Sequence, residues 1–331
     1  MALHLRRKLK PFICRDASFE QLDRPIFILS PPRSGSTWLF ETLRNHPELW
    51  CHRFEAGEIW YDLFHAEGLH GFGDAVPESV VTESLAKALA RDLYSEAILN
   101  PDIQRKFSHR FTAMIKTPAI RYLDKSIANC FRIPLLAKLF PDAKFVVLLR
   151  DPRPTVSSMI DGWGNPVVRL TQVDDWLKSN PPLDPLDPLD AAEWARLKAE
   201  GWSYPVPDGW QSQLHHSTPA KCAWLWDQHV SAIFKALEAP DPAASGKQIS
   251  SRVLSVSYED MMQDQAAVVQ SILKFAELPG LELTSTTAGN RLSRTTMAAP
   301  HPDKWRKNEA VLREIWPVVT ENANRIGVTW N

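Results

Sequence analysis

Apolar residues along the chain form short continuous runs, and these are separated by longer stretches in which apolar positions recur at helical intervals. Four runs have the length and composition of buried strands, and each ends at a polar residue or a tyrosine. They are "PIFILS" (25–30), "FTAMIK" (111–116), "KFVVLLR" (144–150) and "RVLSVSY" (252–258). The spacing between them predicts helices over 38–45, 79–99, 132–140, 219–238 and 262–276. This alternation predicts an α/β fold with a parallel sheet and helices on both faces.

One region departs from this alternation. The stretch 161–218 contains "NPPLDPLDPLD" (180–190), and its repeated prolines cannot continue a helix or a central strand. It is also dense in tryptophan. We expect one domain over residues 1–331, with a Pro/Trp-rich insertion or lid at about 161–218. Its indoles either fasten the insertion to the body or line a lid over a substrate, and both roles stay open.

Charge and cysteine usage narrow the class of protein. The net charge of the 331 residues is −1, which gives a nucleic-acid partner no electrostatic support. No run reaches the roughly 18 apolar residues of a membrane span, and no apolar signal-peptide region follows the basic start. The four cysteines lie far apart, match no metal spacing and suit free thiols in a reducing compartment. We therefore expect a cytoplasmic protein without an integral membrane segment, and a homodimer is compatible with the sequence.

The turn after the first predicted strand, "SPPRSGSTWL" (30–39), has the residue types of an anion site. The first amides of a helix have no partner within the helix and carry partial positive charge. Gly35 permits close approach of a ligand, and Ser34, Ser36 and Thr37 add hydroxyl groups. Arg33 adds a planar cation suited to phosphate or sulfate oxygens. The turn is not a Walker A loop, because no lysine follows the glycine and the cation precedes it.

The other predicted strand ends indicate the same chemistry. Lys116, Arg150 and Tyr258 each close a strand, and ligands of open parallel sheets bind beyond the carboxyl ends of the strands. Ser158 lies eight residues after Arg150, so both could reach one phosphate. Together with Arg33, these cations would repel one another without a polyanion, and a nucleotide with several phosphates would satisfy them. The alternative is that Arg150 pairs with a nearby carboxylate.

These segments, in this order, resemble the sulfotransferases that use 3′-phosphoadenosine-5′-phosphosulfate (PAPS). "SPPRSGSTWL" resembles their 5′-phosphosulfate loop, and its arginine is closer to the tyrosylprotein, carbohydrate and bacterial members than to the cytosolic steroid and phenol enzymes. "FPDAKFVVLLRDPRPTVSSMI" (140–160) resembles their 3′-phosphate motif. "VSYEDMMQDQAAVVQSILKF" (256–275) is similar to their tyrosine-acid-acid segment, and "HPDKWRKN" (301–308) to their late basic loop. The stretch 161–218 matches nothing in the family.

The resemblance implies a P-loop-like three-layer α/β/α domain around a mainly parallel sheet of about five strands. It implies transfer of a sulfuryl group from PAPS to a hydroxyl or amine, with release of adenosine 3′,5′-bisphosphate (PAP) and no metal. Lys116 would face the transferring group, and Arg33 would act beside it. The residues that would hold PAPS are Arg33, Ser34, Gly35, Ser36, Thr37, Trp38, Arg150, Ser158, Tyr258, Lys304, Trp305 and Arg306.

An acceptor hydroxyl has a high pKa, so a general base is expected. The cytosolic enzymes place a histidine two residues after their lysine, where this chain has Pro118. The tyrosylprotein type uses a glutamate after the first helix, which favours Glu55, then Glu58, with His52 third. The pair His215 and His216 also stays open. We expect a small-molecule or lipid-linked acceptor.

Two other functions remain open at this point. A P-loop kinase would require a lysine after Gly35 and an aspartate placed for Mg²⁺, and the sequence provides neither clearly. A non-catalytic nucleotide-binding module on the same fold would bind PAP and transfer nothing. The complete set of predicted cations and hydroxyl groups argues against such a loss of activity.

Overall fold

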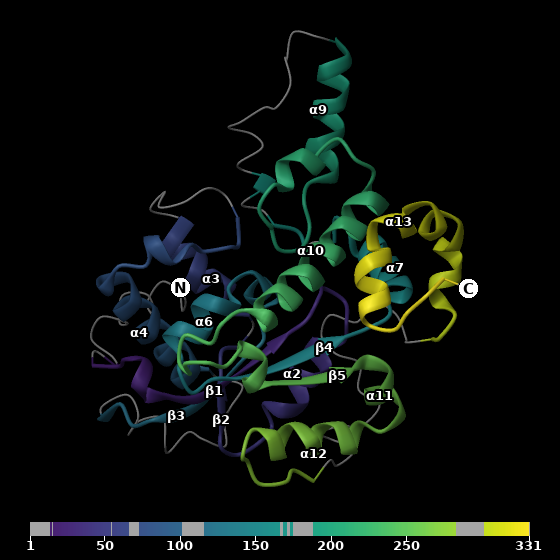
Figure 1. Cartoon of the computed structure of the whole chain (residues 1–331). Coiled ribbons are helices and arrows are strands. Elements are labelled where there is room, and N and C mark those ends of the chain that lie inside the picture. The colour runs from purple at the N-terminus through teal and green to yellow at the C-terminus, as the bar shows by residue number, and fades with distance from the viewer. Residues whose placement is uncertain are drawn as a thin grey trace.

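The computed structural model describes residues 14, 16–53, 55–65, 73–100, 116–165, 168–170, 173–174, 188–282 and 301–330. Its centre is a five-stranded sheet in the order β2-β3-β1-β4-β5, and every neighbouring pair of strands is parallel (Figure 1). The strands are β1 (Leu22–Leu29), β2 (Leu49–Cys51), β3 (Ile120–Asp124), β4 (Lys144–Leu149) and β5 (Val253–Ser257). The predicted α/β class with a parallel sheet is confirmed.

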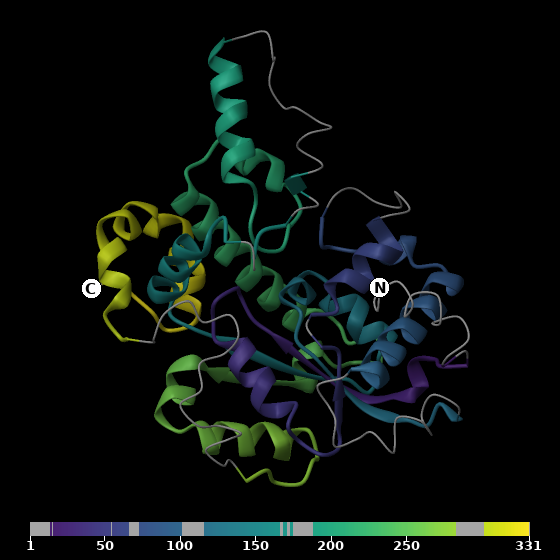
Figure 2. The same cartoon turned by 180° about the vertical axis from the view of Figure 1, so that it is seen from behind.

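Helices cover both faces of the sheet. The longer ones are α2 (Ser36–Leu43), α4 (Glu83–Leu99), α6 (Ile133–Leu139), α7 (Pro152–Gly162), α9 (Pro188–Glu200), α10 (Thr218–Glu238), α12 (Gln265–Phe275) and α13 (Glu309–Arg325). Shorter helical segments are η1 (Phe19–Gln21), α3 (Gly57–Trp60), η2 (Tyr61–His65), η3 (Glu78–Val80), η5 (Ile127–Phe131), η6 (Trp210–Gln213), η7 (Ile249–Arg252), α11 (Tyr258–Gln263) and η8 (Lys304–Asn308). The view from behind shows α2 and α12 together below the sheet (Figure 2).

Successive side chains of β1 point to opposite faces of the sheet, and both faces are covered, so this central strand is buried on both sides. Ile26 and Ile28 pack in a cluster with side chains of α2 and α12. Phe27 and Leu29 point to the opposite face, where α4, α6 and α10 supply the partners. All four side chains are almost fully buried. A strand buried on both faces reads as a continuous apolar run, which is why the sequence pattern locates β1 correctly.

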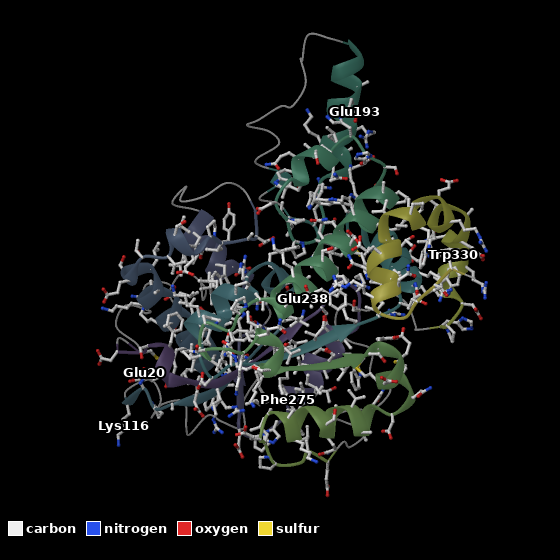
Figure 3. All side chains as sticks on the ribbon, in the orientation of Figure 1. Glu20, Lys116, Glu193, Glu238, Phe275 and Trp330 are labelled. Atoms are coloured by element: carbon white, nitrogen blue, oxygen red, sulfur yellow. The ribbon has the colours of Figure 1, made fainter. Side chains whose placement is uncertain are left out.

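The predicted strand at 111–116 is not confirmed. Residues 111–115 lie outside the described residues, and Lys116 is in helical conformation and exposed. The strand of this region is β3, which begins four residues later. Because all strands are parallel, Lys116 precedes the amino end of β3 and does not reach the carboxyl edge. Figure 3 shows Lys116 pointing outward at the periphery of the molecule.

The reason for this error is that β3 buries charge. Arg121 and Asp124 are both less than a tenth exposed, although a reading of hydropathy assigns such residues to the surface. The Arg121 guanidinium donates to the carbonyl oxygen of Ala276. The Asp124 carboxylate accepts hydrogen bonds from Asn129 Nδ2 at 2.7 Å and from Ser126 Oγ at 3.2 Å. Buried polar groups are tolerated when such partners are present.

The described residues of the stretch 161–218 share a third hydrophobic cluster with α7, α10 and α13, and helix α9 of this stretch projects away from the sheet (Figure 1). Trp202 and Trp210 are fully buried and contact each other edge to face, with ring centroids 5.2 Å apart. Both pack in one cluster with side chains of α7, α10 and α13. These two indoles therefore fasten the insertion to the body.

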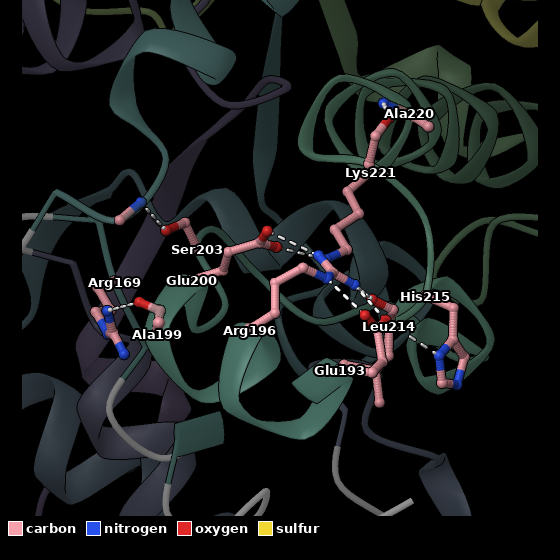
Figure 4. A network of polar contacts seen from close by, with 12 residues as sticks. Arg169, Glu193, Arg196, Ala199, Glu200, Ser203, Leu214, His215, Ala220 and Lys221 are labelled. Carbon is pink, nitrogen blue, oxygen red and sulfur yellow. Dashed lines mark hydrogen bonds and ion pairs between the residues drawn. The ribbon is translucent and has the colours of Figure 1, made fainter. Parts of the chain in front are cut away.

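Ion pairs bind α9 to its surroundings (Figure 4). Arg196 donates to Glu193 Oε2 and to Glu200 Oε1, each at 2.7 Å. Glu200 also accepts from the buried Lys221 of α10 at 3.3 Å. His215 lies 3.5 Å from Glu193. The network links the projecting helix to the long helix α10, which packs against the sheet.

All four cysteines are free and buried, as expected from their spacing. Burial raises the pKa of Cys14 to about 11 and that of Cys130 to about 12. Within the described residues, no helix combines the length and the apolar character that crossing a membrane requires.

A buried ion pair holds the amino end of β5. Arg252 donates to both oxygens of Asp241, at 2.7 and 2.8 Å, and to carbonyl oxygens at the end of α6. We expect Asp241→Ala to lower the free energy of unfolding by about 3–5 kcal/mol, because it leaves a buried cation without its partner. Chemical denaturation measures this loss. Lys87→Ala removes an exposed pair with Glu83 and should leave stability unchanged; an equal loss in both variants would contradict the expectation.

Candidate active site

The site is built at the carboxyl edge of the sheet, where β1 and β4 lie side by side. The chain leaves β1 toward β2 on one side, and it leaves β4 toward β5 on the other. Ligands of open α/β sheets bind at such a point of divergence. Two predicted segments follow these strands directly: the turn 30–35 after β1, and Arg150 with α7 after β4.

The turn after β1 has a strained backbone. Gly35 adopts φ +93° as the residue before α2, and Arg33 adopts φ +65°, which is rare for a residue with a side chain. The α2 helix begins at Ser36, so its first amides face the turn. Ser36 is buried, whereas Thr37 and Trp38 are half-buried. Strain of this kind is typical of functional sites.

Gly35 is required by a close approach of the tyrosine that follows β5. A Cβ atom at Gly35 would lie 2.7 Å from Cδ2 of Tyr258, which is closer than atoms can pack. Tyr258 begins α11, whose first turn is capped by the Ser257 hydroxyl. The absence of a side chain at Gly35 therefore lets the β5 end contact the turn after β1.

Arg150 joins three of the predicted segments. Its guanidinium lies 3.8 Å from the centre of the Tyr258 ring, and its Nη1 donates to the carbonyl oxygen of Arg33 at 3.2 Å. Burial lowers the pKa of Arg150, and the charge of Arg33 acts in the same direction, but an arginine remains protonated. Among the described residues no carboxylate forms an ion pair with Arg150: Asp151 pairs with Arg153 at 2.6 Å, and Asp161 pairs with Lys307 at 2.8 Å.

Arg33 and Ser158 also come together, as predicted. Arg33 Nε donates to Ser158 Oγ at 3.2 Å, although the two residues are 125 positions apart. Ser158 is carried by α7, which begins at Pro152 after an Asp151 cap. Helix α7 thus places the Ser158 hydroxyl group beside the Arg33 cation of the turn after β1.

Several buried donors at this edge have no partner among the described residues. They are the hydroxyl groups of Ser30 and Ser34 and the Nε of Arg150. Unsatisfied buried donors cost free energy, so these groups are available to a ligand that accepts hydrogen bonds. With the amides of α2 and the Arg33 guanidinium, this donor set fits the oxygens of phosphate or sulfate.

A lysine that the sequence reading missed occupies the carboxyl end of β3. Lys125 follows the last residue of that strand, and its side chain is only 6% exposed. Its ammonium group pairs with Oε1 of Glu55, and Glu55 Oε2 accepts from the backbone amide of Ile127 at 3.2 Å. Lys125 therefore stands at the edge where Lys116 was expected. The sequence does indicate this position, because Lys125 directly follows "AIRYLD" (119–124). The charges of Arg121 and Asp124 made that segment unlike a buried strand.

The remaining base candidates are placed differently. Glu58 is exposed in the first turn of α3. His52 follows β2, is buried, and has its Nε2 3.6 Å from Glu96. His215 and His216 are exposed in the insertion. Glu55, in contrast, contacts Lys125 at the end of β3.

The late basic segment packs on α7. Asn308 Nδ2 donates to Ser157 Oγ at 3.0 Å, which brings η8 next to the helix that carries Ser158. Lys304 and Trp305 are half-buried. Arg306 is exposed and pairs with Asp303 and Glu309 of its own segment, so in this conformation its charge is already neutralised.

Comparison with known proteins gives one family match, over the first half of the chain. Residues 25–181 match the family model described as the sulfotransferase family, and the resemblance expected from the motifs is confirmed over this part of the chain. No curated protein matches the chain.

Solved structures that the chain is similar to are also sulfotransferases. One is the sulfotransferase domain from the curacin biosynthetic pathway, with 17% identity over 92% of this chain and 98% of that chain, and a TM-score of 0.44. Another is STF9 from Mycobacterium avium, with 17% identity over 93% and 78%, and a TM-score of 0.45. A third is mouse SULT7A1 complexed with PAP, with 13% identity over 95% and 91%, and a TM-score of 0.37.

The packing of Tyr258 on Gly35 makes a prediction about stability. Gly35→Ala should lower the free energy of unfolding by about 2–4 kcal/mol, the sum of a strained φ and an overpacked contact. Gly246→Ala is the matched control, because Gly246 has φ +74° with nothing within 4 Å of its Cβ position. It should lose only about 1–2 kcal/mol. Equal losses in chemical denaturation would show that the Tyr258 ring moves aside without cost.

Proposed function

We propose that this chain transfers a sulfuryl group from PAPS to a hydroxyl or amine of a small-molecule or lipid-linked acceptor. The observation that carries the proposal is the convergence of anion-binding groups from four segments: Arg33 contacts Ser158, and Arg150 contacts both the Arg33 carbonyl and Tyr258. Two phosphate positions on one nucleotide explain why two arginines gather at one edge. The family match over 25–181 supports this reading.

In this proposal each part of the donor has its own partners. Arg33 and the first amides of α2 hold the 5′-phosphate and its bridging oxygen, and the buried Ser34 hydroxyl adds a donor. Arg150 and Ser158 hold the 3′-phosphate, and Lys304 approaches it from η8. The Tyr258 ring packs against the Arg150 guanidinium and borders the adenosine.

Lys125 takes the role first assigned to Lys116 and faces the transferring group. Its pairing with Glu55 keeps the lysine charge compensated until substrates enter. Glu55 then accepts the proton of the acceptor hydroxyl. The acceptor oxygen forms a bond to sulfur, and the bond from sulfur to the bridging phosphate oxygen breaks with its electron pair going to PAP. Lys125 and Arg33 stabilise the charge that develops during this in-line transfer.

Calorimetry with PAP tests the donor site. The unaltered protein should bind PAP, and Arg150→Ala should weaken binding by about 10- to 100-fold, because a charged hydrogen bond to phosphate is lost. Arg325→Ala is the control for net charge, since Arg325 pairs with Glu238 on the surface of α13. No uptake of PAP by the unaltered protein, or equal weakening in both variants, would contradict the proposal.

The base is tested by paired glutamate variants. Glu55→Gln should retain PAP binding and lose about 100-fold or more in transfer rate, because an amide cannot accept the proton. Glu58→Gln should retain both. Mass spectrometry of cell extract incubated with labelled PAPS first identifies a sulfated product, and its rate of formation is then compared. Normal turnover in Glu55→Gln would remove Glu55 from this role.

A further inference from the structure

Residues 202–206 of the insertion, which we call the strap, are buried against the body although the family motifs do not include them. Trp202, Ser203, Tyr204 and Val206 are each less than 5% exposed. The strap follows α9, and its contacts reach α7 at one end and Asp74 at the other.

On one side the strap holds the end of α7. The Tyr204 hydroxyl donates to the carbonyl oxygen of Met159 at 3.0 Å. The amide of Gly164 donates to Ser203 Oγ at 3.0 Å, an interaction drawn in Figure 4. Met159 is the residue after Ser158, so the contact is made one position from a proposed phosphate ligand.

The Met159 carbonyl needs a partner from outside the helix. In a regular helix it would accept from the amide of Trp163, four residues on. That amide donates instead to Ile160 at 3.2 Å, because α7 ends there with a tighter turn. The Tyr204 hydroxyl therefore satisfies a carbonyl that the last turn of α7 leaves without its regular bond.

Tyr204 makes this contact at a cost in backbone energy. Its φ is +71°, a conformation that costs a residue of this size about 1–3 kcal/mol. Two contacts keep Tyr204 in this conformation. Its ring packs edge to face against Trp163, with 6.2 Å between centroids, and its backbone amide donates a hydrogen bond to the Val168 carbonyl oxygen at 3.1 Å. A strained backbone at a buried residue is consistent with a need to place the Tyr204 side chain in one position.

On the other side the strap is held by Asp74. Val206 and Asp74 exchange two hydrogen bonds, at 2.6 and 2.7 Å, and Asp74 Oδ1 accepts from the buried Arg132 at 2.9 Å. Arg132 immediately precedes α6 on the sheet. The strap is thus fixed at both ends, and it cannot move freely relative to α7.

Tyr204 also lies within electrostatic range of the donor loop. Burial raises the pKa of Tyr204, and the positive charge of Arg33 opposes that rise. Arg33 in turn donates to Ser158. The charge of Arg33 therefore acts on Tyr204, and its guanidinium contacts Ser158.

We propose that Tyr204 is a positioning residue of the donor site: its bond to Met159 fixes the last turns of α7, and thereby the Ser158 hydroxyl that meets Arg33 and the 3′-phosphate. This role rests on the proposed function. It makes the stretch 161–218 a part of the nucleotide site.

The test compares Tyr204→Phe with Tyr94→Phe. Tyr94 is an apt control, because it is fully buried and its hydroxyl donates to the Pro118 carbonyl at 2.8 Å, near the amino end of β3. Both variants lose one buried hydroxyl-to-carbonyl bond. Calorimetry with PAP and hydrogen exchange of the α7 amides are measured on the full chain.

Tyr204→Phe should weaken PAP binding by about three- to tenfold, the factor that one hydrogen bond supplies, and speed exchange in α7. Tyr94→Phe should change neither, although it loses similar stability. Unchanged binding and exchange in Tyr204→Phe, or equal changes in both variants, would overturn the positioning role. If the unaltered protein takes up no PAP, the proposed function fails, and the exchange of α7 alone still decides whether Tyr204 fixes that helix.

Discussion

The stacking of the Arg150 guanidinium on Tyr258 is the interaction on which the candidate site depends. It brings the ends of β4 and β5 together, and the bond from Arg150 to the Arg33 carbonyl adds the turn after β1. A cation so deeply placed would be unfavourable without partners, because burial penalises its charged form. The aromatic face and the carbonyl oxygen reduce that cost. Arg150 Nε has no partner among the described residues, and the phosphate proposed here would supply one.

Much of this arrangement was readable from the sequence, and the reason is physical. Strands β1 and β4 contain continuous apolar runs, and β5 is a partly apolar segment that ends at Tyr258, so the ends of all three are visible in the sequence. The residues directly after them fall at one edge by topology. Gly35 and Arg33 were found because a tight turn between strand and helix uses few residue types. The helices α4, α6, α10 and α12 follow from their spacing alone.

What sequence reading could not supply lies where tertiary contacts override local pattern. Strand β3 carries Arg121 and Asp124 inside the core, and only partners distant in sequence make their burial tolerable. Missing that strand displaced the predicted lysine from position 125 to 116. The role of the insertion was equally hidden, since nothing in a run of prolines and tryptophans shows that Tyr204 ends up beside α7.

The burial of the cysteines has a practical consequence for handling the molecule. Burial raises the pKa of the Cys14 and Cys130 thiols, and the thiolate is the reactive form. Alkylating reagents and mild oxidants should therefore spare the native chain and modify it only when it opens. The rate of cysteine alkylation therefore reports the rate at which the chain unfolds, and this measurement does not require the acceptor to be known.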